Sequence, residues 1–281
     1  MKKITAAVLC FICATLCGCG ARDSSIQQTA QQSETSETDL QNISSVPEVE
    51  YLSTESAVWV EQLKKSGSIL VDFNGDGRED SLSVEYGEIE GETYIEKLEV
   101  RYGNFPSPYV LENYRSTVKN LESGDINMDG IPELILCMDS GTQGGNGSMG
   151  LLILCPKDGE IFPLTLPKDL YTGCSFEVVS EDGGAHYSIL CEESGMAFTA
   201  DGAGQGEAGP DHRIEGWADG AYQVKLVQLE GKTGLEIYQY IAGNSHTEEL
   251  GDAVTGIVWE EDGAGILYQY FEPCENKAGI Y

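Results

Sequence analysis

Positive charge is scarce in this sequence: 16 lysines and arginines stand against 47 aspartates and glutamates, a net charge of −31 over 281 residues. Recognition of phosphates needs a basic face, so this composition argues against a nucleic-acid partner. It also excludes electrostatic adsorption to an anionic membrane surface. Hydrophobic residues make up 41% of the chain, enough to fill a core, so an acidic disordered chain is excluded too.

Catalytic motifs are also missing. The three histidines, His186, His212 and His246, show no zinc-binding spacing, and no Cys-x-x-Cys follows residue 19. Ser148 lacks the first glycine of G-x-S-x-G, because Asn146 stands there. Sequence spacing does not exclude a catalytic Ser–His–Asp triad, because the three residues of a triad can be far apart in sequence and meet only in the folded protein. The motifs therefore give no reason to predict an enzyme.

Long apolar runs are absent except at the N-terminus. Two lysines precede the largely apolar stretch 4–16, whose 13 residues are fewer than the roughly 17–25 of a spanning helix. It ends in Leu16-Cys17-Gly18-Cys19, which resembles the lipobox of bacterial lipoproteins. The resemblance implies a signal peptide over residues 1–18 and a lipid on the Cys19 sulfur, hence an extracytoplasmic protein anchored to the membrane. The alternative is an ordinary cleaved signal with a cysteine nearby.

Two changes of composition divide the rest of the chain. Residues 19–46 hold no aromatic side chain and are crowded with Ser, Thr and Gln, so we expect a flexible tether there. Residues 47–281 form the predicted folded domain. The chain contains 34 glycines among 281 residues, against a usual share of about 7%, which favours short strands and many turns.

Two nine-residue segments, 72–80 and 125–133, share one pattern and are called the first and second loop. Both read D-x-N-x-D-G-x-x-[D/E], with oxygen-bearing side chains at positions 1, 3, 5 and 9. Calcium binds six to eight such oxygens, and glycine at position 6 permits the sharp turn. We therefore predict two Ca²⁺ sites, with position 7 contributing its backbone carbonyl. The predicted ligands are Asp72, Asn74, Asp76, Arg78 and Asp80, and Asp125, Asn127, Asp129, Ile131 and Glu133.

The flanks of these loops do not fit an EF-hand. An EF-hand needs a glutamate at position 12 and a helix on each side, but Ser83 and Leu136 stand at that position. The segments after both loops are patterned as strands. Such loops resemble the FG-GAP and VCBS repeats of integrin-like β-propellers and of bacterial surface lipoproteins, which implies a calcium-binding turn at the start of a blade strand. The alternative is a metal-free, Asx-rich turn.

The predicted fold is all-β, with antiparallel meander sheets in a β-propeller-like arrangement of about four blade-like units. The two loops start 53 residues apart, and a degenerate third copy starting at Gln228 fits a period near 52. Lys232 would occupy its position 5, so we expect no metal there. A Gly-rich loop, 139–150, is expected to be either functional or a plain surface hairpin.

Cysteine positions predict one disulfide. A two-residue hairpin turn at Asp182-Gly183 would place Cys174 opposite Cys191, within bonding distance. Cys137, Cys155 and Cys274 are left over, so at least one buried free thiol is expected.

These features together predict a surface binding or adhesion module whose calcium is structural, with a carbohydrate or a surface protein as ligand. Two alternatives stay open. One is an extracytoplasmic hydrolase acting on cell-wall or dietary glycan, which a deep cleft with two carboxyl groups would favour. The other is an accessory subunit of a surface complex, which a large exposed apolar patch would favour.

Overall fold

The computed structural model describes residues 48–52, 56–139, 148–164, 173–203, 212–229, 231–260 and 263–274. The predicted signal peptide, the lipid-bearing Cys19, the tether and most of the Gly-rich loop 139–150 lie outside the described residues. Among the helices that are described, none is long and apolar enough to cross a membrane.

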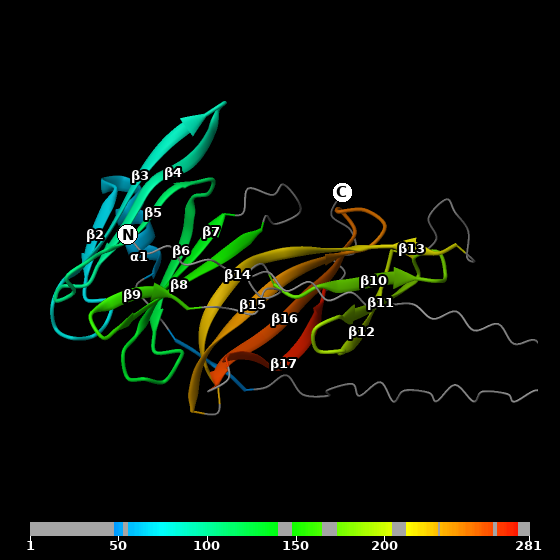
Figure 1. Cartoon of the computed structure of the whole chain (residues 1–281). Coiled ribbons are helices and arrows are strands. Elements are labelled where there is room, and N and C mark those ends of the chain that lie inside the picture. Colours follow the sequence, from blue (N-terminus) through cyan, green and yellow to red (C-terminus); the bar gives the residue numbers. More distant parts are fainter. Residues whose placement is uncertain are drawn as a thin grey trace, which may run out of the picture. The chain divides into compact units, whose positions relative to one another are not determined.

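The described chain is nearly all β and forms four antiparallel sheets (Figure 1). The first two sheets are simple meanders, ordered β2-β3-β4-β5 and β6-β7-β8-β9. Their strands are β2 (Ser68–Val71), β3 (Asp80–Ile89), β4 (Glu92–Arg101), β5 (Tyr109–Tyr114), β6 (Val118–Gly124), β7 (Glu133–Asp139), β8 (Met149–Lys157) and β9 (Glu160–Pro163).

The third sheet is ordered β12-β11-β10-β13, and the fourth is ordered β1-β14-β15-β16-β17. The first described strand thus joins the last sheet, since β1 pairs with β14. The four sheets confirm the predicted all-β fold of about four blade-like units. The strands are β10 (Phe176–Ser180), β11 (His186–Cys191), β12 (Ala197–Asp201), β13 (Ile214–Glu215), β1 (Glu50–Tyr51), β14 (Trp217–Leu229), β15 (Lys232–Ala242), β16 (Glu249–Glu260) and β17 (Gly263–Pro273).

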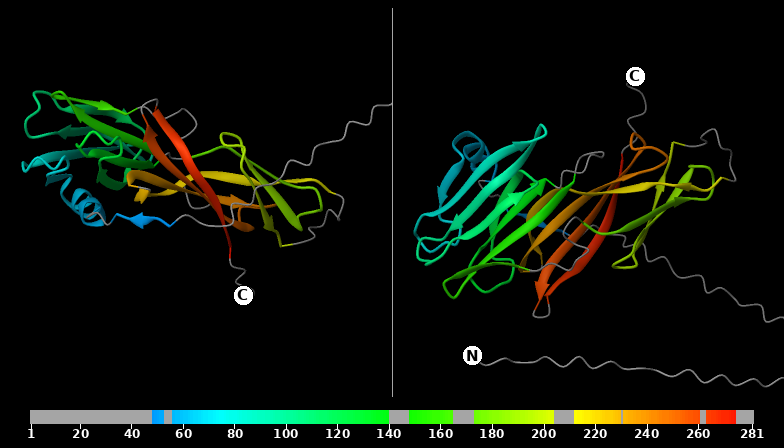
Figure 2. Two further views of the ribbon diagram at one scale, coloured as in Figure 1. Left: turned by 90° about the horizontal axis from the view of Figure 1, so that it is seen from below. Right: turned by 45° about the horizontal axis from the view of Figure 1, so that its top comes forward.

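The sheets do not pack in chain order (Figure 2). One core lies between the first and second sheets, and a second core joins the second sheet to the fourth. A third core joins the fourth sheet to the third. Strand β7 contributes side chains to two of these cores: Leu134 and Leu136 belong to the first core, and Ile135 and Cys137 belong to the second. The period-2 alternation of a strand makes this possible.

One helix, α1 (Ser56–Ser66), was not predicted. Its apolar side chains Trp59, Val60 and Leu63 are buried in the first core. Gly67 ends it with a left-handed φ of 72° and an N–H that donates to the Leu63 carbonyl at 2.8 Å. The signals were present in the sequence: apolar residues at helical spacing, two lysines in the last turn and a glycine after it.

The β10–β11 register corrects the disulfide prediction. Phe176 pairs with Cys191, and a five-residue connection replaces the expected two-residue turn, so the ladder is shifted by two from expectation. Cys174 therefore does not lie opposite Cys191, and both are free thiols in the structure. Cys137 and Cys155 are free and buried, as is expected of unpaired thiols.

The prediction of a third, degenerate loop copy starting at Gln228 is also wrong. Gln228 lies within β14 and pairs with Thr233, while Leu229 pairs with Lys232. A tight hairpin therefore occupies the place of the expected loop, because the extended strands β14 and β15 pair to their ends.

Candidate functional site

The two loops occupy equivalent places in their sheets. The first loop connects β2 to β3, and the second connects β6 to β7, so each joins the first two strands of a meander. The residue at position 9, Asp80 or Glu133, is the first residue of the following strand. This confirms that the loops lie between strands.

The two loops share their backbone-to-side-chain hydrogen bonds, and the second loop adds one between side chains, from Asn127 Nδ2 to the Glu133 carboxylate. The position-1 carboxylate accepts the N–H groups of positions 5 and 6, at 3.1 and 2.8 Å in the first loop and at 3.0 Å for both in the second. The position-3 amide oxygen accepts the same position-5 N–H, at 3.1 and 2.9 Å. The position-5 carboxylate accepts the N–H of position 7, at 2.9 and 3.0 Å. Side-chain oxygens from three positions thus converge on one backbone turn.

Backbone angles follow the same pattern. Positions 4 and 6 have left-handed φ values in both loops: 74° and 82° at Gly75 and Gly77, and 58° and 88° at Met128 and Gly130. The glycine at position 6 meets this requirement without steric cost. The requirement at position 4 was not foreseen, because a methionine occupies it in the second loop.

The carboxyl group at position 9 is buried in each loop, with residue exposures of 1% for Asp80 and 0% for Glu133. Each accepts the N–H groups of positions 2 and 3, at 2.8 and 3.3 Å in the first loop and at 3.0 and 3.4 Å in the second. Burial raises the pKa of Asp80, and it raises the pKa of Glu133 to about 7, because a buried carboxylate loses its hydration.

The second loop gathers its possible ligand atoms more closely than the first. One ligand atom each from Asp129, Glu133 and Cys155 lies within 4.8 Å of the others. Among the described residues, no such group includes the carboxylates of the first loop, so that loop would have to tighten around an ion. Cys155 was not predicted here, and burial raises the pKa of its thiol to about 12. Oxygen ligands alone suit calcium.

The side chains of Arg78 and Ile131, at position 7, are exposed. Their N–H groups are held by the position-5 carboxylates. Only the backbone of this position therefore belongs to the loop interior, which is compatible with the predicted role of its carbonyl.

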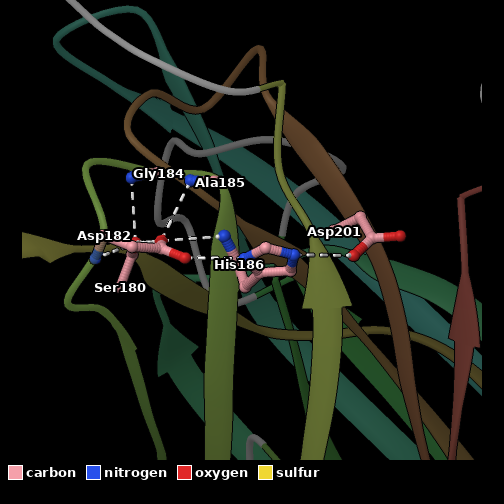
Figure 3. A network of polar contacts seen from close by, with 6 residues as sticks. All are labelled: Ser180, Asp182, Gly184, Ala185, His186 and Asp201. Atoms are coloured by element: carbon pink, nitrogen blue, oxygen red, sulfur yellow. Dashed lines mark hydrogen bonds and ion pairs between the residues drawn. The ribbon is translucent and has the colours of Figure 1, made fainter. Parts of the chain in front are cut away.

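A polar network on the third sheet surrounds His186 (Figure 3). Its Nδ1 lies 2.6 Å from Asp182 Oδ2, and its Nε2 lies 3.9 Å from Asp201 Oδ1. The Ser180 hydroxyl donates to Asp182 at 2.8 Å and not to the histidine. These residues therefore do not form a Ser–His–Asp triad, in which the imidazole must bind the serine hydroxyl.

Two surface hollows bear on the hydrolase alternative. One, of about 300 Å³, is lined by Glu90 and Glu92, but Glu92 is paired with Arg115. The other, of about 290 Å³, contains Glu248, whose carboxylate accepts the N–H groups of Asn244 and Ala203 at 2.7 and 2.8 Å. Neither hollow presents a pair of free carboxylates, so neither supports glycoside hydrolysis.

The two loops are thus the part of the described chain in which a repeated sequence pattern and a repeated geometry coincide. Comparison with protein-family models, with curated proteins and with solved structures finds no match for this chain.

Proposed function

We propose that this protein is a lipid-anchored, extracytoplasmic binding module of the FG-GAP/VCBS type, stabilised by two Ca²⁺ ions in loops 72–80 and 125–133. The observation that carries the proposal is the shared set of backbone-to-side-chain hydrogen bonds in the two loops, together with left-handed residues at positions 4 and 6 of both. Two segments with different residues at positions 2, 4, 7, 8 and 9 share these backbone features.

Charge favours calcium over a metal-free turn. Each loop carries three candidate carboxylate ligands, one of them buried. Without a cation, such groups repel one another and lose hydration. A carboxylate oxygen that accepts one N–H keeps a lone pair for a metal, so the observed hydrogen bonds are compatible with coordination.

The proposed role of the metal is structural, because the first loop is tied to its surroundings. Asp80 Oδ1 accepts the N–H of Gly103 at 2.8 Å, which joins the loop to the segment after β4. The Ser123 hydroxyl donates to the carbonyl of Phe73 at 2.6 Å, which joins the loop to β6 of the second sheet. An ion here would rigidify the junction of two sheets. Extracellular sites of this kind bind calcium at ~10⁻⁴–10⁻³ M.

The bound partner is proposed by class only. The anchor on Cys19 would hold the domain near the membrane, where a carbohydrate or another surface protein is the available ligand. The acidic composition suits neither nucleic acid nor an anionic lipid surface.

Calorimetric titration of the full chain in detergent tests the metal sites. We expect about two Ca²⁺ ions to bind, and the melting temperature to be higher in calcium than in EDTA. At a calcium concentration ten times the Kd, each site adds about 1.4 kcal/mol to the free energy of unfolding. Identical melts and no heat of binding would refute the proposal.

Matched variants assign the sites. Asp76→Ala and Asp129→Ala should each remove one ion, whereas Glu79→Ala, an equal loss of charge at position 8 of the first loop, should keep both. Glu133→Gln should lose the calcium response of the second loop, because it removes the buried carboxylate ligand. If Glu79→Ala reduced calcium binding as much as Asp76→Ala does, the loss of binding would come from the general loss of negative charge rather than from the loss of a ligand.

A further inference from the structure

A second group of possible ligands lies away from the calcium loops, at the open end of the β10–β11 hairpin. Cys174 Sγ, Cys191 Sγ and a Glu193 carboxylate oxygen all lie within 4.8 Å of one another. The two cysteines are 6% and 0% exposed, whereas Glu193 is exposed and opens the group to solvent. The Glu193 carboxylate is also fixed, because both of its oxygens accept the N–H of Ser175, at 2.8 and 3.0 Å.

The strand register explains why two close sulfurs are not bonded. The Glu192 N–H donates to the Ser175 carbonyl at 2.9 Å, which continues the ladder past Phe176 and Cys191. Cys174 then lies diagonal to Cys191, and diagonal neighbours have Cα atoms about 7–8 Å apart. Disulfides usually need about 4.4–6.8 Å. The two sulfurs therefore lie close together without forming a disulfide. Two sulfurs bound to one zinc ion are at most about 4.6 Å apart, so a separation of this order suits a shared metal ion.

Two buried glutamines organise this group. Gln269, 1% exposed, points its Nε2 at both sulfurs, at 3.5 Å from Cys174 and 3.3 Å from Cys191. Gln239, also 1% exposed, accepts the Cys174 N–H at 2.6 Å and donates to its carbonyl at 2.9 Å. Burying amides is costly unless their hydrogen bonds are used. Here those bonds fix the Cys174 backbone and aim N–H groups at sulfur, as supporting residues do around metal-bound thiolates.

Gly173 leaves the space that the Gln239 side chain needs to reach the backbone of Cys174. A Cβ at this position would lie 2.3 Å from Gln239 Cδ, so only glycine lets the amide reach the backbone of Cys174. The hydroxyl of Thr255 accepts from Gln269 at 2.9 Å and lies 3.7 Å from the Cys174 sulfur. The geometry of both cysteines is therefore held from two sides.

We propose that Cys174, Cys191 and Glu193 form a site for one thiophilic metal ion of the Zn²⁺ class. Binding replaces each S–H bond with an S–metal bond and releases the two thiol protons to solvent. One carboxylate oxygen of Glu193 completes three protein ligands, which leaves the fourth tetrahedral position to water or an exogenous group on the solvent side. The oxygen-only calcium loops and this sulfur-containing site select different metals.

Titration of the reduced full chain in detergent with Cd²⁺ tests the site, because cadmium bound to thiolate gives an ultraviolet charge-transfer absorption. We expect one thiolate-bound ion, whose absorption is lost in Cys174→Ser and Cys191→Ser. The absorption should be retained in Cys137→Ala, a buried thiol outside the group, and in Cys155→Ala, which removes the thiol beside the second calcium loop. Zn²⁺ should displace the cadmium, and Ca²⁺ should not.

Glu193→Gln is a second variant that should leave the fold intact, because this residue is exposed. The Glu193→Gln variant should keep the absorption but bind Zn²⁺ about tenfold or more weakly. The neighbouring Glu192→Gln should change the Zn²⁺ affinity little. An unchanged affinity in Glu193→Gln, or equal absorption in the wild type and Cys174→Ser, would overturn the proposal. So would a Cys174–Cys191 disulfide in the isolated chain that, once reduced, binds no metal. The Cys155→Ala control separates these outcomes from cadmium bound at the second calcium loop.

Discussion

Asp182 shows how one side chain sets both a turn and a charge state. Its Oδ1 accepts the N–H groups of Ala185 and His186 at 3.1 and 2.9 Å, which shapes the connection between β10 and β11. Its other oxygen contacts the imidazole of His186 at 2.6 Å (Figure 3). The hydrogen bond to Asp182 raises the pKa of His186, and the same contact lowers the pKa of Asp182.

The pair should stabilise the fold in a limited pH window. Its contribution to stability falls as the pH rises through the raised pKa of His186, because the imidazolium is lost, and it falls as the pH drops through the lowered pKa of Asp182. NMR titration should place the His186 pKa above 6.5. Asp182→Asn should lower it towards 6.5, and Asp201→Asn, at 3.9 Å, should lower it less. A value that Asp182→Asn leaves unmoved would contradict this assignment.

The calcium loops behave as short elements with a fixed backbone shape. Position 4 of the second loop is Met128 at a φ of 58°, where the first loop has glycine. A non-glycine residue in the left-handed region costs roughly 1–2 kcal/mol, so the second loop carries strain that the first lacks. The loop tolerates it because its N–H groups are held by the side chains of positions 1, 3 and 5.

Relieving that strain should be measurable. Met128→Gly should raise the free energy of unfolding by roughly 0.5–1 kcal/mol, the strain relieved less the added entropy of glycine in the unfolded chain. Gly130→Ala should lower it by roughly 1 kcal/mol, since φ is 88° there. Urea unfolding in EDTA separates these backbone effects from metal binding. Destabilisation by Met128→Gly would show that the side chain contributes packing that outweighs the strain.

At the scale of the whole molecule, β7 connects two hydrophobic cores. Residues 133–138 are all buried; Leu134, Leu136 and Met138 belong to the first core, and Ile135 and Cys137 belong to the second. A strand covered on both faces couples the sheets on either side, because neither core can open without exposing it.

Truncation on either face of β7 should therefore affect one common transition. Leu136→Ala and Ile135→Ala should each lower the free energy of unfolding by about 2–5 kcal/mol, as leucine and isoleucine truncations in cores do. Fluorescence and circular dichroism should shift together, and Leu70→Ala, at a residue 60% exposed, should have little effect. Two separated transitions in Leu136→Ala would mean that the cores unfold independently.

Local patterns determined much of this protein. The nine-residue loops, the alternating segment after Asp80 and the apolar run after Glu133 are short-range features, so the all-β class, the meanders and the position of each loop between strands followed from sequence. The hydrogen bonds within each loop form because their donors and acceptors are close in sequence. The helix after Ser56 carried a readable local signal that was missed.

Long-range packing decided the rest. The insertion of the fourth sheet between the second and third, the burial of Glu133 and the diagonal meeting of Cys174 with Cys191 depend on contacts between distant segments. A two-residue shift of one hairpin changed a predicted disulfide into a candidate metal site, because register decides which side chains face one another. No local pattern encodes that register when a five-residue connection replaces a tight turn, so only the tertiary structure could reveal it.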